Sequence, residues 1–265
     1  MPPLTSTIAD AGVSVTKARP MKVNAKSGAG SAEVCFKRSD GQVKVVAWND
    51  LDPNAVAEGR PWRTFPWYLG QKNYSGLYWC ATEARLVGYE SRLELTRLVM
   101  ADFDVAAKRI VSQPFRLTAT IGKERIRRVP DYLVLTEAGV HVIDVTRASK
   151  LERPEFARVV EQTRQIVESR GWIYEVASEP PRVEYSTIRF LAGYRRPWLF
   201  KPEALAEVRQ VAKRVPELTI GEISSRTTLP RPTALPALMH LLWRQEFRVD
   251  LTRRLSPHTM VRTMA

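Results

Sequence analysis

Apolar and polar residues begin to alternate at Glu33, and this alternation predicts a β-hairpin. Its two runs are Val34 to Arg38 and Val43 to Trp48, with Ser39-Asp-Gly41 between them. An Asp-Gly pair favours the tight turn that joins antiparallel strands. Residues 1–30 are small and polar without such periodicity, so we expect a flexible N-terminal arm in front of the hairpin.

The middle of the chain alternates between helical and strand periodicity. A helix is predicted from Ser91 to Phe103, because Leu95, Leu98 and Val99 fall on one side of it. Strands at 110–121, 129–135 and 140–145, a helix at 154–169 and a strand at 172–176 follow, with a basic turn at 122–127. The first three strands should form an antiparallel meander, and the helix should return the last strand parallel to its neighbour. The expected fold class is α/β, with a central mixed sheet flanked by helices.

Beyond residue 197 the periodicity is that of short helices. The pattern predicts helices at 203–214, 219–225 and 233–246, then short strands at 247–251 and 253–261. Helices followed by a hairpin in this order are typical of a small winged-helix domain. We therefore expect two folded parts, residues 31–197 and residues 198–265.

Charge narrows the class of partner. The 265 residues hold 41 Lys and Arg against 28 Asp and Glu, a net charge of +13, which favours nucleic acid as the partner over a membrane surface. Two cysteines and three scattered histidines form neither a disulfide framework nor a zinc ligand set. No apolar run is long enough for a membrane span or a signal core, so we expect a cytoplasmic protein.

Residues 60–89 interleave aromatic side chains with Arg and Lys. Such a segment can stack on bases and contact phosphates. It can equally be a loop whose aromatic rings pack on a neighbouring core, and the sequence leaves both interpretations open.

Three acidic residues occupy positions where an apolar residue is expected. Glu94 lies beside Leu95 on the predicted helix, Asp131 lies in the strand 129–135, and Asp144 interrupts the apolar run 140–145. A carboxylate in a half-buried strand costs several kcal/mol unless something compensates its charge. Hard oxygen ligands on neighbouring elements suit Mg²⁺, with Mn²⁺ as an alternative, so we predict a metal site that hydrolyses phosphodiesters.

The spacing of these acids resembles the PD-(D/E)xK nuclease superfamily, with Pro130-Asp131 as the first element and Asp144-Val-Thr146 as the second. A closer resemblance is to the TnsA-like endonuclease subunits of heteromeric transposases. It is carried by Ser91-Arg-Leu-Glu94, Ser112-Gln-Pro-Phe115, Pro130-Asp131-Tyr132 and Val142-Ile-Asp-Val145. It implies a restriction-endonuclease-like fold followed by a winged-helix domain.

The resemblance assigns roles to individual residues. Glu94, Asp131 and Asp144 match the metal-binding acids of the family. The family usually has a lysine two residues after the position of Asp144, where this chain has Thr146. Arg147 should point to the opposite face of the sheet, because side chains alternate along a strand.

Three further residues were considered for the catalytic set. Lys123, on the predicted turn, and Lys150, beyond the end of a strand, are the candidates to replace the missing lysine. Gln113 is a candidate to line the same cleft, although Gln-Pro can also be a structural bend.

The resemblance also implies partners. The protein would cleave the 5′ ends of a transposon on double-stranded DNA, beside a DDE-type, TnsB-like transposase subunit and an AAA+, TnsC-like ATPase regulator. Two alternatives stay open: a non-catalytic DNA- or protein-binding module with a degenerate nuclease fold, and another restriction or repair nuclease. In the C-terminal part, Arg244, Arg248, Arg253 and Arg254 are the candidates for DNA contact, although they can also face an acidic protein.

Overall fold

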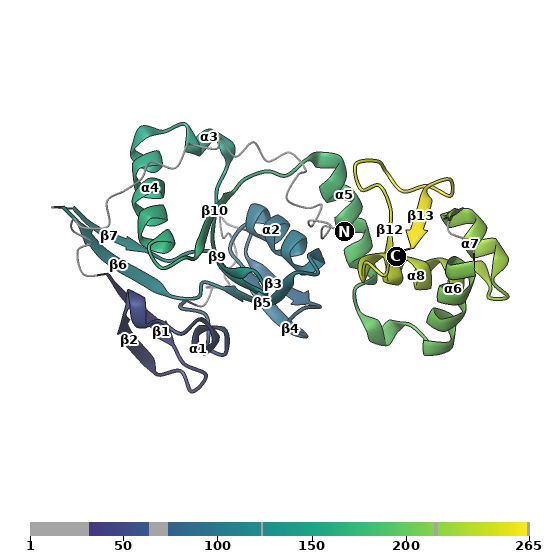
Figure 1. Cartoon of the computed structure of the whole chain (residues 1–265), viewed down its shortest axis with the longest axis horizontal. Coiled ribbons are helices and arrows are strands. Elements are labelled where there is room, and N and C mark those ends of the chain that lie inside the picture. Colours follow the sequence, from purple (N-terminus) through teal and green to yellow (C-terminus); the bar gives the residue numbers. More distant parts are fainter. Residues whose placement is uncertain (1–31, 64–73, 123, 215–216, 264–265) are drawn as a thin grey trace, which may run out of the picture.

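A computed structural model of the chain describes residues 32–63, 74–122, 124–214 and 217–263 (Figure 1). One sheet is mixed and has the strand order β10-β9-β8-β5. Its strands are β5 (Ala107–Ser112), β8 (Tyr132–Thr136), β9 (Gly139–Val145) and β10 (Ile173–Ala177). β5, β8 and β9 are antiparallel neighbours, and β10 is parallel to β9. The predicted mixed sheet and the α/β class are confirmed.

Helices pack against this sheet as the apolar spacing predicts. α2 (Arg92–Phe103) contacts β4, β5 and β9, and α4 (Pro154–Glu168) packs on β10. α4 starts with proline at its first turn, where no intrahelical N–H bond is lost. The chain then turns at Gly171, whose φ of +77° favours glycine, and enters β10. The short helix α3 (Ala148–Leu151) lies between β9 and α4.

A second sheet has the order β2-β1-β6-β7 and joins the N-terminal hairpin to the middle of the chain (Figure 1). Its strands are β1 (Glu33–Lys37), β2 (Val43–Ala47), β6 (Arg116–Ile121) and β7 (Glu124–Arg128). The hairpin is therefore confirmed. Trp48, in the 3₁₀ turn Trp48–Asp50, closes the core of this region, and its indole N–H donates to the carbonyl of Ile166 at 2.9 Å. The helix α1 (Pro53–Ala57) follows.

Two predictions for this region are wrong. The strand expected at 110–121 is two strands in different sheets, because the backbone breaks at Gln113 and Pro114. The basic turn expected at 122–127 is largely the strand β7. A strand that covers a core on one face needs few apolar residues, and Ile126 is the one that β7 buries.

The aromatic segment contains a further element that the pattern did not predict. β3 (Gly76–Cys80) and β4 (Arg85–Tyr89) form an antiparallel hairpin, while residues 64–73 lie outside the described part of the chain. The aromatic side chains of Tyr78 and Tyr89 belong to the core, so the packing interpretation holds for these two residues. Tyr74 is exposed, with the Arg92 guanidinium over its ring. The predicted arm, residues 1–30, also lies outside the described residues.

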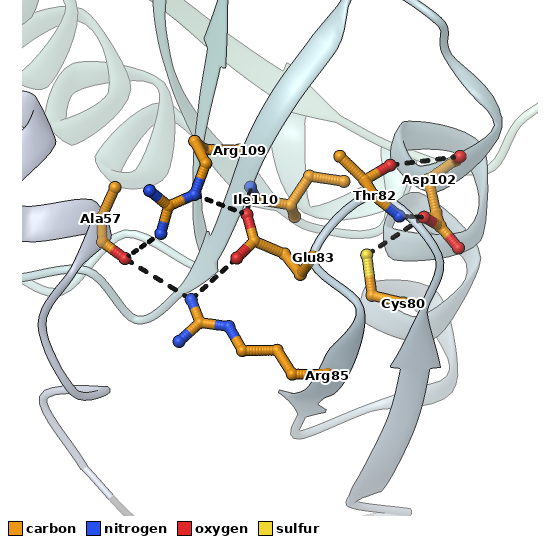
Figure 2. A network of polar contacts seen from close by, with 8 residues as sticks. All are labelled: Ala57, Cys80, Thr82, Glu83, Arg85, Asp102, Arg109 and Ile110. Atoms are coloured by element: carbon orange, nitrogen blue, oxygen red, sulfur yellow. Dashed lines mark hydrogen bonds and ion pairs between the residues drawn. The ribbon is translucent and has the colours of Figure 1, made fainter.

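Asp102, near the end of α2, ties that hairpin to the helix (Figure 2). Its carboxylate accepts hydrogen bonds from the Tyr78 hydroxyl at 2.8 Å and the Cys80 thiol at 3.1 Å. It also accepts the backbone N–H groups of Ala81 at 3.0 Å and Thr82 at 2.8 Å. Burial, followed by the Asp102 charge, raises the pKa values of Tyr78 and Cys80, so both stay neutral donors.

Beside it, Glu83 holds the hairpin to β5 (Figure 2). Its carboxylate pairs with Arg109 at 3.2 Å and with Arg85 at 2.9 Å, and it accepts the N–H of Ile110 at 2.6 Å.

The C-terminal part has the element order helix, strand, helix, helix, strand, strand (Figure 1). α6 (Pro202–Arg214), α7 (Ile220–Arg226) and α8 (Arg231–Trp243) pack on a small antiparallel sheet of order β11-β13-β12. Its strands are β11 (Glu217–Thr219), β12 (Phe247–Arg248) and β13 (Met260–Thr263). The three predicted helices are confirmed. The last two strands pair as a hairpin, but their predicted bounds are wrong: β12 covers only the start of the strand expected at 247–251, and β13 begins at Met260, so most of the strand expected at 253–261 is the connection between them. Pro257 in that connection has no N–H to donate to a ladder.

The boundary expected at residue 197 falls in a 3₁₀ turn, Pro197–Leu199, but the apolar core continues across it. α5 (Arg182–Leu191), followed by the 3₁₀ turn Ala192–Tyr194, contacts both α2 and α8. Phe103 and Trp243 pack with ring centroids 5.2 Å apart, and the Gln245 amide donates to the Phe103 carbonyl at 2.5 Å. The two parts therefore share a buried interface. In the described ranges, no helix has both the length and the apolar character needed to cross a membrane.

Candidate active site

Asp131 is held by three hydrogen bonds at the start of β8. Its backbone N–H donates to the Ile143 carbonyl at 3.0 Å, and its own carbonyl accepts the Gln113 N–H at 2.8 Å. Its Oδ2 accepts the N–H of Val145 at 2.6 Å. The strand expected from residue 129 begins only at Tyr132, because Pro130 has no N–H to donate to a ladder. Asp131 thus lies at a strand end, beside the segment of β9 that carries Asp144.

Glu94 stands at the first turn of α2, where the N-cap Ser91 and the preceding Glu90 hold its side chain. The Ser91 hydroxyl accepts the Glu94 N–H at 3.1 Å and donates to its Oε1 at 2.9 Å, while Oε2 accepts the Glu90 N–H at 2.7 Å. The Ser-x-x-Glu motif therefore has a structural role in helix initiation. The Tyr132 hydroxyl donates to the Glu94 carbonyl at 3.2 Å, which connects this helix end to the residue after Asp131.

Asp144 is 3% exposed and compensated by two neighbours. The Tyr174 hydroxyl donates to its Oδ2 at 2.5 Å, and the Arg128 guanidinium forms an ion pair with the same oxygen. Tyr174 comes from β10 and Arg128 from β7, so the two sheets meet at this carboxylate.

The charges of Glu94 and Asp144 both act on the pKa of Asp131. Burial, then the negative charge of Glu94, raises the pKa of Asp131 to about 8; the Asp144 charge acts in the same direction, whereas the Val145 N–H and Arg128 oppose it. Burial also raises the pKa of Glu94. The predicted acids are thus brought into one electrostatic neighbourhood.

Gln113 is the least satisfied polar residue of this region. Its side chain is 1% exposed, and within the described part of the chain neither its amide oxygen nor its amide nitrogen has a hydrogen-bond partner. Its φ of +45° is uncommon for a residue with a side chain. The backbone is fixed in this conformation because its N–H donates to Asp131 and its carbonyl accepts the Trp62 N–H at 2.8 Å. A strained residue with an orphaned amide indicates a functional position more than a bend.

The two candidate lysines do not supply a cation to this site in what the structure describes. Lys150 lies on α3 with its ammonium 4.5 Å from the centre of the Phe156 ring, and Lys123 is outside the described residues. Thr146 is buried, and its N–H donates to the Ala177 carbonyl at 2.9 Å. The cation at the carboxylates is Arg128. The sequence pattern does not indicate this role, because Arg128 lies just after a segment, 122–127, for which the pattern predicts a turn.

A basic pocket of about 400 Å³ lies next to this ion pair. It is lined by Trp62, Arg63, Arg116, Arg127, Arg128 and Val129. The Arg116 guanidinium stacks 4.6 Å from the centre of the Trp62 ring. The same Trp62 donates its N–H to Gln113, so the pocket and the strained residue are parts of one structure.

The four C-terminal arginines do not share one site. Arg244 follows α8, Arg248 is on β12, and Arg253 and Arg254 are in the connection to β13. Arg254 lines a second pocket of about 860 Å³ between α5, α7 and α8, with mainly apolar neighbours such as Phe190, Leu235 and Met239. α8 itself is mostly buried, and His240 within it contacts the Tyr194 carbonyl at 2.7 Å through Nδ1.

Whether a divalent cation fits beside Asp131 and Asp144 depends on how many protein ligands the cation needs. Among the residues that the structure describes, no three His, Cys, Asp or Glu side chains form a group that could hold a metal ion. Mg²⁺, however, usually takes one or two carboxylates and completes its shell with water and substrate phosphates. Asp131 and Asp144 are hard oxygen donors. The negative charges of Glu94 and Asp144 oppose ionisation of Asp131, and a cation between Asp131 and Asp144 would offset this repulsion. The donor chemistry therefore fits Mg²⁺ or Mn²⁺, with Glu94 adjacent.

We expect the metal-free wild type to lose stability relative to Asp131→Asn as the pH rises. The folded-state pKa of about 8 lies above the ordinary value of 3.8, so the folded protein keeps a proton that the unfolded chain has released. The associated stability is complete below about pH 4 and is lost as the pH rises through about 8. Between about pH 5 and pH 8, the difference in unfolding free energy between the two proteins should change by about 3 kcal/mol. Urea denaturation with a chelator present measures it, and a constant difference would contradict the assignment.

Comparison of the chain with protein-family models gives no match, and comparison with curated proteins gives no significant one, so the geometry of the site carries the functional argument.

Proposed function

We propose that this protein is a metal-dependent DNA endonuclease. The observation that carries the proposal is the position of Asp131 beside Asp144 on the neighbouring strands β8 and β9. Glu94 is linked to the same region through the Tyr132 hydroxyl, and the backbone of Gln113, whose amide is orphaned, bonds to Asp131. Mutually opposed buried carboxylates are a stability cost in the metal-free protein, and such costs are typical of functional sites. The net charge of +13 and the neighbouring arginines suit a phosphodiester substrate.

Each residue of the site has a defined task in this proposal. Asp131 and Asp144 would hold the divalent cation, which supplies Lewis-acid activation of water and of the scissile phosphate. Glu94 adds negative charge beside Asp131, and its carboxylate is fixed by the Ser91 hydroxyl and the Glu90 N–H. The Gln113 amide, with an unused donor and an unused acceptor, would orient water or a phosphate oxygen. Hydrolysis adds water to the phosphorus and breaks one P–O bond, and the departing oxygen takes up a proton.

The finer assignment is a TnsA-like subunit of a heteromeric transposase, acting in the cytoplasm at the 5′ ends of a transposon. The order of carboxylates on helix, strand and strand agrees with the resemblance to the PD-(D/E)xK superfamily. The C-terminal element order agrees with a winged helix. Its third helix, α8, is mostly buried beyond its exposed first turn, so little of it is available to a DNA groove. We therefore infer a protein partner for this part, such as the transposase or ATPase subunit.

One observation favours a second candidate, a non-catalytic binding module. Thr146 stands where the family has lysine, and the Arg128 guanidinium already neutralises the Asp144 carboxylate in an ion pair. A scaffold that had lost catalysis would keep such a pair as a substitute for the metal. The two candidates differ in whether phosphodiester bonds are cut.

Cleavage of DNA by the wild-type chain is the direct test. Supercoiled plasmid that carries the DNA bordering the gene is incubated with the protein and with the products of any adjacent transposase and ATPase genes. We expect nicks that need Mg²⁺ or Mn²⁺ and disappear with a chelator, at the 5′ borders when strands are mapped. Intact plasmid under all of these conditions would contradict the nuclease and leave the binding module.

A further inference from the structure

The basic pocket holds more positive charge than its carboxylate partners balance. Of its four arginines, Arg63 pairs with Glu90 at 3.5 Å and Arg128 pairs with Asp144. In the part of the chain that is described, Arg116 and Arg127 form no ion pair with a carboxylate. The pocket therefore has a net charge near +2, which favours an anion.

Its hydrogen-bond donors are also incompletely used. The Nε groups of Arg116 and Arg128 are buried, and neither has an acceptor among the described residues. A buried N–H group without an acceptor destabilises the folded protein by about 1–3 kcal/mol. A ligand oxygen that accepted from either Nε group would remove this penalty. The forked guanidinium is suited to the oxygens of a phosphate.

The position of Arg128 relates the pocket to the carboxylates. Side chains alternate along a strand, so Thr146 continues the face of Asp144. A lysine at 146 would place its charge on that face. Arg128 reaches the same face from β7 in the other sheet, as its contact with Asp144 shows.

We propose that the pocket formed by Arg63, Arg116, Arg127 and Arg128 binds a phosphate of the DNA strand, and that Arg128 provides the positive charge which Thr146 does not. In the metal-free protein its guanidinium neutralises Asp144. Asp144 would be one of the residues that hold the cation, and the Arg128 guanidinium would then be available to a phosphate oxygen. This inference rests on the proposed nuclease function and assigns the substrate contact within it.

The matched variants are Arg128→Gln, Arg127→Gln and Arg125→Gln, which remove one charge each from β7. Arg125 is exposed and does not line the pocket, so it is the control. Binding of a short duplex is measured by fluorescence anisotropy in Ca²⁺, with inorganic phosphate as a competitor, and Mn²⁺ binding is measured by calorimetry. Arg128→Gln should weaken duplex binding about tenfold, and Arg127→Gln several-fold, because each removes a charge-assisted contact.

Arg128→Gln should change the affinities for the DNA duplex and for Mn²⁺ in opposite directions. Mn²⁺ should bind several-fold more tightly, because Asp144 loses its competing cation, and Arg128→Lys should restore part of the duplex affinity. Failure of inorganic phosphate to compete would identify the DNA strand, rather than free phosphate, as the ligand.

The results separate this inference from the nuclease proposal. Duplex affinities of Arg128→Gln and Arg127→Gln equal to that of Arg125→Gln would overturn the pocket, even if wild type cuts DNA. A loss of duplex binding with no Mn²⁺ binding by wild type would overturn the nuclease and retain the phosphate site. If Arg128→Gln does not fold, Arg127→Gln decides, because its side chain compensates no described carboxylate.

Discussion

Asp131→Ala is expected to nick DNA about a thousandfold more slowly than wild type. The backbone of Asp131 is fixed by Ile143 and Gln113, and its carboxylate is fixed by the Val145 N–H. In the proposed function this carboxylate is a metal ligand, and Asp131→Ala removes it. Loss of metal activation removes several kcal/mol of transition-state stabilisation, and about 4 kcal/mol corresponds to a thousandfold. Rates are measured on the same plasmid, with saturating Mn²⁺, in the presence of the partner subunits.

The matched control is Glu137→Ala at the other end of β8. Its side chain is 84% exposed and pairs only with Lys108 at the surface, so its nicking rate should stay within a factor of two of wild type. A folded Asp131→Ala that nicks as fast as Glu137→Ala would show that the metal site lies elsewhere.

Asp102→Ala is expected to destabilise the protein by about 4 kcal/mol or more, enough to abolish soluble expression of a marginally stable chain. The carboxylate is 6% exposed and accepts four hydrogen bonds, from Tyr78, Cys80, Ala81 and Thr82. Its removal leaves four donors without an acceptor in a site that water enters poorly. Chemical denaturation of purified protein measures the loss.

Neighbouring variants separate this network from a general effect of mutation. Asp104→Ala, two residues away, loses one exposed hydrogen bond to the Ala106 N–H and should cost less than about 1 kcal/mol. Tyr78→Phe removes one of the four donors and should cost about 1 kcal/mol. An Asp102→Ala protein as stable as Asp104→Ala would refute the structural role assigned to Asp102.

The candidate carboxylates could be selected from the sequence because each is an acidic residue among apolar neighbours. Asp144 in an apolar strand and Glu94 on an apolar helix face are local anomalies, and a window of ten residues is enough to notice them. The mixed sheet could also be predicted from local sequence, because its strands are apolar runs bounded by turn residues. The elements β9, α4 and β10 were found in this way.

Arg128 and β7 could not be predicted in this way. Glu124 to Arg128 contains a single apolar residue, and nothing within the segment shows that it continues the sheet that begins with β1 at Glu33. The contact between Arg128 and Asp144 is specified only when both sheets are assembled. The hairpin β3–β4 was missed because its aromatic residues are also compatible with an irregular loop that packs on the core.

The origin of Arg128 in the second sheet has a consequence for how such a site can change in evolution. β5 and β8 are neighbours in one sheet, and the chain between them leaves it to form β6 and β7 in the other. Asp131 and Asp144 therefore belong to one sheet and Arg128 to the other. A lysine at position 146 can then be replaced by a neutral residue without an inactive intermediate, provided that the arginine on β7 is already present. Substitutions at 128 and 146 should thus be epistatic across a lineage, with a basic residue retained at one position or the other.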